Sequence, residues 1–192
     1  MSTANKKAAL LLAAKTLFGE YGYVETTFKK ISDHAGVALG LLTHHYGNKE
    51  KLFFAAGMDV LERLLATLRA ATARGKNGFE ASVFFCQAYL DFSTDPDAHW
   101  NVLVRCSPYS DVKSDEDREQ LTAQFNQVHE ELARQLRRGI ADGSIRALDI
   151  KETTQIIIST MSGVNRTNML TPYASKGLYP ETLRFISRAI QS

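Results

Sequence analysis

The sequence contains only two cysteines and four prolines in 192 residues. Cys86 and Cys106 lie far apart and form no CxxC pair, a usage that favours a reducing compartment over a disulfide scaffold. No apolar run approaches the roughly 18 residues of a membrane-spanning helix. The Ala- and Leu-rich stretch near the N-terminus is interrupted by Lys15 and Glu20, unlike the core of a signal peptide. These absences predict a soluble, cytoplasmic protein.

The motifs of common enzyme classes are also missing. The sequence has no GxSxG, HExxH or GxGxxG motif and no phosphate-binding glycine loop. Cys86, His99 and Cys106 are scattered, and we interpret them as core and surface residues rather than as a metal, catalytic or redox site. We therefore expect no enzymatic activity, no cofactor and no metal.

Charge is unevenly distributed along the chain. The first 52 residues contain seven lysines, no arginine and four acidic residues, whereas the remainder holds sixteen basic and seventeen acidic residues. The apolar fraction of 44% and the charged fraction of 23% are ordinary for a globular protein. The N-terminal quarter is therefore the better partner for a polyanion.

Hydrophobic spacing indicates an all-α protein of about nine helices, with no β alternation. We expect a first helix over residues 5–21, ended by Gly22, and short helices after Thr27 and over residues 38–45. Asn48 is a good N-cap for a long fourth helix. Further helices are expected between the breaks at residues 74–78, 93–96, 107–114, 143–149 and 171–172.

The most informative segment, residues 26–52, reads TTFKKISDHAGVALGLLTHHYGNKEKL. Two helices of about two turns are joined by a tight glycine turn, and Ile31, Val37 and Leu42 supply apolar anchors. This pattern is typical of a helix-turn-helix, whose second helix enters the major groove of DNA. The alternative interpretation is an ordinary helical hairpin within a bundle.

The same segment resembles the tetracycline-repressor-like (TetR) family of bacterial regulators. The shared positions are Thr26 and Thr27, Ile31, Ala35-Gly36-Val37, Gly40, His44-His45-Tyr46, Lys49 and Leu52. The resemblance implies a three-helix DNA-binding domain over residues 1–50 and a helical ligand-binding and dimerisation domain over residues 51–192. It also implies a homodimeric repressor that binds a palindromic double-stranded operator and is released by a small-molecule effector.

The candidate DNA-contacting residues lie in or beside the two short helices. Thr27 and Lys49 stand at helix starts, where N–H groups and side chains can meet phosphate oxygens. Leu39 and Thr43 depart from the family pattern, and they suit apolar contact with a thymine methyl group. We expect Tyr46 to be a core residue. The full predicted set is Thr27, Lys29, Ala38, Leu39, Gly40, Thr43, His44, His45 and Lys49.

The candidate effector site lies in the larger region. Its predicted residues are Phe84, Tyr89, Trp100, Arg105, Phe125, His129, Met161, Asn165 and Asn168. Such sites are mostly apolar, with a few placed polar groups, and Arg105 or His129 can pair with an anionic ligand. For dimerisation we expect the last two helices, in which small residues allow close approach: Ser159, Ser162 and Gly163, with Ile186 and Ile190 nearby. Intramolecular packing of these residues is the alternative.

Two other functions fit the same pattern. One is a helical module whose helix-turn-helix binds protein, and the other is an activator without a small-molecule inducer. Salt-dependent binding to DNA separates the first of these from a regulator. The operator sequence, the effector, the regulated genes and the sign of regulation are left open at this stage.

Overall fold

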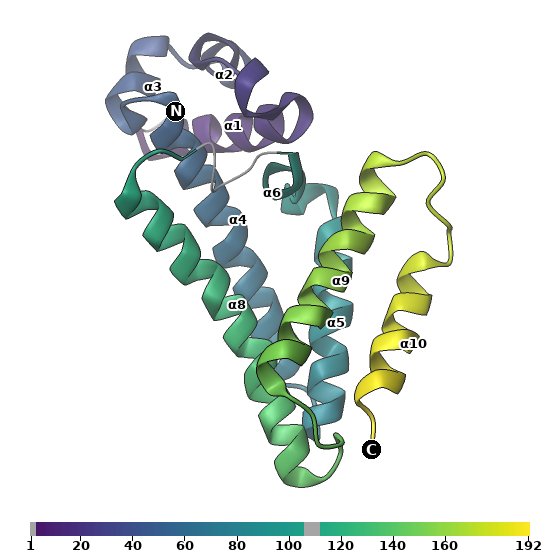
Figure 1. Cartoon of the computed structure of the whole chain (residues 1–192). Helices are drawn as coiled ribbons and strands as arrows, with labels where there is room; N and C mark the ends of the chain where they lie inside the picture. Colours follow the sequence, from purple (N-terminus) through teal and green to yellow (C-terminus); the bar gives the residue numbers. More distant parts are fainter. Residues whose placement is uncertain (1–2, 106–111) are drawn as a thin grey trace. The chain divides into compact units, whose positions relative to one another are not determined.

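The computed structural model describes residues 3–105 and 112–192, without the side chains of Thr3 and Arg105. These residues form nine α-helices and one short 3-10 helix and no β-sheet (Figure 1), which confirms the predicted fold class. The helices are α1 (Thr3–Glu25), α2 (Phe28–Ala35), α3 (Leu39–Tyr46), α4 (Lys49–Thr72), α5 (Gly78–Thr94), η1 (Pro96–Ala98), α6 (Asn101–Arg105), α8 (Asp115–Asp142), α9 (Ile150–Leu170) and α10 (Leu178–Ile190).

Local capping explains where several helices begin. Asn48 accepts a hydrogen bond from the backbone N–H of Lys51 at 2.9 Å, as predicted for the start of α4. The carboxylate of Asp149 accepts the N–H of Glu152 at 2.9 Å and starts α9 in the same way. One boundary differs from the prediction, because α1 is broken at Gly22 (φ 78°, ψ 176°) and then continues to Glu25.

The chain forms two compact units. The first comprises Met1–Glu62 with Asp95–Gln124, and the second comprises Arg63–Thr94 with Phe125–Ser192. Helices α4 and α8 contribute residues to both. These two units are defined by contacts between residues, whereas the expected boundary after residue 50 separates a DNA-binding from a ligand-binding domain. That functional boundary stays a prediction.

In the first unit, α1 packs against α2, α3 and α6 around a buried core. The fully buried side chains include Leu10, Phe18, Ile31, Leu42 and Phe53. Two ionic groups are buried with them: Lys15 of α1 pairs with Asp59 of α4, and Asp117 of α8 pairs with Lys51 of α4. The core thus joins the short N-terminal helices to the start of the long fourth helix.

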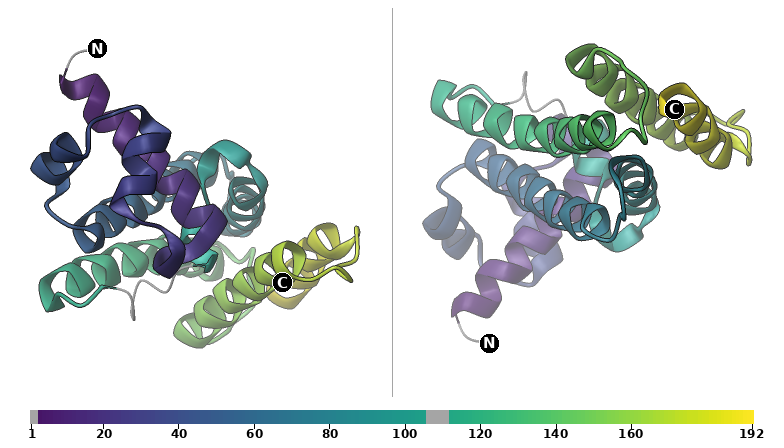
Figure 2. Two further views of the ribbon diagram at one scale, coloured as in Figure 1. Left: turned by 90° about the horizontal axis from the view of Figure 1, so that it is seen from above. Right: turned by 90° about the horizontal axis from the view of Figure 1, so that it is seen from below.

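In the second unit, α5, α9 and α10 pack against one another, and α9 and α10 run antiparallel (Figures 1 and 2). Gly78 at the start of α5 meets Gly139 of α8 so closely that a side chain at residue 78 would collide with backbone. Ile186 and Ile190 of α10 are 3% and 1% exposed, so they pack inside the unit. The alternative of intramolecular packing therefore holds for these two side chains, whereas the use of the last two helices for dimerisation stays a prediction. Among the described residues, no helix combines the length and apolar character that a membrane crossing requires.

Candidate nucleic-acid interface

Three buried apolar side chains hold α2 and α3 together. Ile31 of α2 and Leu42 of α3 are fully buried, and Val37 between the helices is 8% exposed. Gly36 ends α2 in the left-handed conformation (φ 62°), where a residue with a Cβ atom is strained. The predicted anchors and the predicted turn are thus confirmed.

The opposite face of α3 is open to solvent. Leu39 is 45% exposed, although Leu42 one turn later is fully buried. Ala38, Gly40, Thr43 and His44 are also exposed, and a Cβ atom added at Gly40 would meet no atom within 4 Å. The hydroxyl of Thr43 donates to the carbonyl of Leu39 at 3.2 Å, which leaves its methyl group available for contact. This exposed face of Ala38, Leu39, Gly40, Thr43 and His44 is called the α3 face below.

Thr27 is the N-cap residue of α2, and Lys29 lies in its first turn. The Thr27 hydroxyl oxygen accepts the N–H of Lys30 at 3.2 Å and caps the helix, while the residue stays exposed. Lys29 forms an ion pair with Asp33 at 3.0 Å, with side chains 76% and 64% exposed. An ion pair so exposed contributes little free energy, so the Lys29 ammonium can leave it for another anion.

Three residues of the same segment are directed into the first unit instead. The Nε2 atom of His45 is buried, with no hydrogen-bond partner among the described residues. The Lys49 ammonium donates to the carbonyl oxygen of Tyr23 at 3.0 Å. Tyr46, predicted as core, is half-buried and donates its hydroxyl proton to the carbonyl of Lys7 at 3.2 Å. Burial, and secondarily the charge of Asp59, raises the pKa of Tyr46, which keeps this hydroxyl a donor.

The residues predicted for an effector site are divided between the two units. Met161 and Asn165 are fully buried in the second unit, while Phe84, Phe125 and His129 are half-buried there and Asn168 is exposed. Trp100 is buried in the first unit, and the side chain of Arg105 lies outside the described residues.

Side-chain hydroxyl groups connect α5 to α9 within the second unit. The hydroxyls of Tyr89 and Ser162 are 3.0 Å apart. Burial raises the pKa of Tyr89 to about 12, so the phenol remains protonated. The Ser93 hydroxyl lies 2.9 Å from the side-chain oxygen of Asn165. These contacts make Tyr89 and Asn165 part of a polar layer between two helices.

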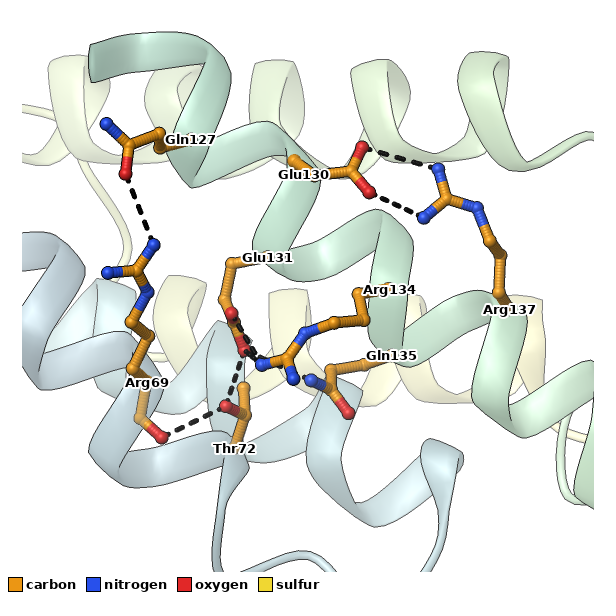
Figure 3. A network of polar contacts seen from close by, with 8 residues as sticks. All are labelled: Arg69, Thr72, Gln127, Glu130, Glu131, Arg134, Gln135 and Arg137. Atoms are coloured by element: carbon orange, nitrogen blue, oxygen red, sulfur yellow. Dashed lines mark hydrogen bonds and ion pairs between the residues drawn. The ribbon is translucent and has the colours of Figure 1, made fainter.

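A polar network also joins α4 to α8 in the second unit (Figure 3). The carboxylate of Glu131 is 4% exposed, and Arg134 lies 2.7 Å from it. It also accepts the hydroxyl proton of Thr72 at 2.6 Å and the side-chain amide of Gln135 at 3.0 Å. This buried charge is therefore well supplied with donors.

The described residues contain no group of three histidine, cysteine or acidic side chains that can hold a metal ion. Burial raises the pKa of the Cys86 thiol to about 12, so little reactive thiolate forms at neutral pH. Cys106 lies outside the described residues.

An apolar groove lies between α9 and α10. Its volume is about 170 Å³, and Ile156 and Phe185 at its rim are 61% and 57% exposed. Its other lining residues are Arg146, Leu148, Thr153, Ile157, Thr160, Ile186, Ala189 and Ile190. None of the predicted effector residues lines this groove. Sequence reasoning missed the exposure of Ile156 and Phe185, because helical spacing alone does not distinguish a core stripe from a surface stripe.

Residues 10–56, which contain the α3 face and its anchors, match a family model described as "Bacterial regulatory proteins, tetR family". Over these residues the chain is similar to the TetR family. The HTH-type transcriptional repressor AcnR of Corynebacterium efficiens is 33% identical over 64 residues, which cover 33% of this chain and 34% of that protein. The match thus spans about a third of the length of this relative.

Two further proteins resemble a larger share of the chain. The HTH-type transcriptional repressor KstR2 of Rhodococcus jostii is 28% identical over 145 residues, covering 74% of this chain and 69% of KstR2. The crystal structure of a TetR-family transcriptional regulator from Agrobacterium tumefaciens has a TM-score of 0.85 at 17% identity, with 100% of both chains covered. At this identity the structural likeness shows a shared fold.

Proposed function

We propose that this chain is a TetR-family DNA-binding transcriptional regulator that acts as a ligand-responsive repressor on a palindromic operator. One observation carries the proposal: α3 is fixed from behind by Leu42, which is fully buried, and turns Leu39, Thr43 and His44 toward solvent. A helix held in this way can enter the major groove without unfolding its own support. AcnR and KstR2 are both named repressors, which supports repression rather than activation.

The DNA-contacting surface combines the α3 face with the start of α2. Leu39 and Thr43 offer apolar and methyl groups to thymine, and His44 offers a ring nitrogen to a base edge. Thr27 and Lys29 meet phosphate oxygens, which fix register rather than sequence. His45 and Lys49, the remaining members of the predicted set, support this surface from the protein side.

Dimerisation is proposed to use the groove between α9 and α10. A single α3 reads too few base pairs for useful specificity, and a two-fold dimer reads two half-sites about one helical turn apart. Ile156 and Phe185 are large apolar side chains that are both exposed at the rim of this groove. Exposed apolar surface of this kind marks a site of association, and Ser159 and Gly163, exposed on the same helix, permit close approach.

A small-molecule effector is proposed to bind the second unit through the polar layer that includes Tyr89 and Asn165, next to apolar Met161. Such binding would favour a dimer whose two α3 faces are wrongly spaced for the operator. Helix α4, which has residues in both units, is the covalent route for this change. A repressor of this kind acts in the cytoplasm and needs no catalytic activity.

Recovery of bound duplexes from a random DNA pool with the purified chain tests the proposal. The expected result is a palindromic consensus bound more weakly as salt increases. Failure to recover any duplex at low salt would contradict the proposal and favour a protein-interaction module.

A pair of charge substitutions locates the contact surface. Gly40→Glu places a carboxylate in open space on α3, near the helix start where negative charge is tolerated, so folding is preserved. It is expected to weaken duplex binding by about tenfold or more through phosphate repulsion. The control Ala70→Glu adds the same charge at an exposed position of α4 and is expected to leave affinity nearly unchanged.

A separate substitution tests base recognition. Leu39→Arg is expected to shift the recovered consensus toward guanine.

A further inference from the structure

Two lysines of the helix-turn-helix region contact the same feature, the C-terminal end of α1. Lys49 at the start of α4 donates to the Tyr23 carbonyl at 3.0 Å, and its ammonium lies 4.3 Å from the centroid of the Tyr23 ring. Lys30 of α2 donates to the Glu25 carbonyl at 2.8 Å and lies 5.7 Å from the Tyr21 ring centroid. Each ammonium therefore combines a backbone acceptor with an aromatic face.

The physical reason lies in how α1 ends. Backbone carbonyl oxygens accept charge-assisted hydrogen bonds from ammonium groups, and Tyr23 and Glu25 follow the break in α1 at Gly22. The last four residues of α1 are Gly22, Tyr23, Val24 and Glu25, so the sequence supplies no cation from within this turn. Lys30 and Lys49 supply it from the two helices that follow, and a cation within about 6 Å of a ring centroid gains further attraction.

The Tyr23 side chain is itself held in place. Its ring centroid lies 6.0 Å from that of Phe18 on α1 and 5.1 Å from that of Phe53 on α4. Phe18 and Phe53 also meet edge to face, with 5.2 Å between their centroids. Lys49 thus rests on an aromatic cluster that joins the end of α1 to the first turns of α4.

These two contacts bracket the recognition helix. Lys30 precedes α3 in the chain and Lys49 follows it, and both return to the end of α1. We propose that Lys30 and Lys49 are positioning residues that clamp the two ends of the α3 segment, rather than lysines that neutralise DNA phosphates. The consequence for DNA binding rests on the proposed function, whereas the clamp itself concerns the free protein.

Amide hydrogen exchange tests the clamp without DNA. In Lys49→Met the amides of residues 39–46 are expected to exchange about threefold faster or more, because a charge-assisted hydrogen bond and a cation–π contact are lost together. Lys49→Arg retains both kinds of contact and should restore protection. The matched control is Lys29→Met, which removes an exposed lysine of the same segment. Equal exchange rates in Lys49→Met and the native chain would overturn the proposal, whether or not the protein binds DNA.

The salt dependence of duplex binding tests the second half of the proposal. Removing a phosphate-contacting lysine lowers the slope of log affinity against log salt by about 0.9, or about twice that in a dimer. Using the duplex recovered from the random pool, Lys30→Met and Lys49→Met are expected to bind several-fold more weakly with an unchanged slope. A slope reduced by about one per lysine would overturn the proposal. A native chain that binds no duplex would instead refute the proposed function, while the exchange experiment still decides the clamp.

A double-mutant cycle tests whether Lys49 acts through its contact with the Tyr23 ring. Tyr23→Leu removes the aromatic face under Lys49, so its effect on exchange in residues 39–46 and that of Lys49→Met should not add. Additive effects would contradict a shared contact. If Tyr23→Leu does not fold, the comparison of Lys49→Met with Lys49→Arg carries the test by itself.

Discussion

Lys15 of α1 and Asp59 of α4 form an ion pair, with 2.6 Å between the ammonium nitrogen and the carboxylate oxygen. The two partners are not equally buried, because the Lys15 side chain is 9% exposed and the Asp59 side chain is 32% exposed. The pair fastens the first helix to the helix that follows the recognition segment. Because the two side chains differ in burial, removal of one partner is expected to lower the free energy of unfolding more than removal of the other.

Asp59→Asn is expected to destabilise the protein more than Lys15→Met. The first substitution leaves a buried ammonium without its counter-charge, which costs about 3–5 kcal/mol of unfolding free energy. The second leaves a carboxylate that water can still reach, and it costs about 1 kcal/mol or less. Urea unfolding of the two variants measures the difference. The reverse order would show that the ammonium is better solvated than the structure implies.

Phe185→Glu is expected to convert a dimer to a monomer. Phe185 lies at the rim of the groove between α9 and α10, and a carboxylate there opposes burial against a second copy. The dissociation constant should rise about thirtyfold or more, as for a central interface residue. Sedimentation over a range of concentrations measures it. Tyr173→Glu is the control, since Tyr173 is 80% exposed and does not line the groove; loss of the dimer only in this control would place the interface elsewhere.

Thr72→Val is expected to lower the free energy of unfolding by about 1–3 kcal/mol, because the buried Glu131 carboxylate loses a hydroxyl donor at 2.6 Å while the shape of the side chain is kept. The comparison variant Glu130→Gln disrupts the exposed pair with Arg137, visible beside the network in Figure 3, and should cost about 1 kcal/mol at most. Chemical denaturation compares both with the native chain. Equal effects would mean that Glu131 is not dependent on Thr72.

Glu50 gives one source of pH-dependent stability. Backbone N–H groups of Ser114 and then Lys113 hold the pKa of Glu50 below its ordinary value of 4.5. A carboxyl group whose pKa falls on folding stabilises the native state above the ordinary pKa, and this contribution is lost as pH decreases through the lower folded-state pKa. Glu50→Gln should therefore be less stable than the native chain at pH 7, with the difference shrinking in acid. A difference independent of pH would contradict this assignment, and Glu62→Gln, at an exposed position of the same helix, is the control.

Much of the fold follows from local signals in the sequence. Asn48 and Asp149 start helices because their side chains accept backbone N–H groups three residues later, and Gly36 ends one because it adopts a positive φ. The anchors Ile31 and Leu42 are also readable, since an apolar residue in a short amphipathic helix must face a partner. These features depend on residues within one or two turns of each other, so the sequence alone contains their cause.

The tertiary structure determined which neighbours, or solvent, the apolar face of each helix contacts. Ile186 and Ile156 both occupy apolar positions of their helices, yet Ile186 is 3% exposed and Ile156 is 61% exposed, because only the packing of α10 on α5 and α9 distinguishes the two faces. For Lys49, a polar residue, the sequence likewise does not determine which group its side chain contacts. Its long side chain can reach solvent, a phosphate or a carbonyl, and the partner it contacts in the structure, Tyr23, lies 26 residues earlier in the chain. Residue type and spacing determined the helices and the recognition segment, whereas contacts between residues distant in sequence determined which side chains support that segment.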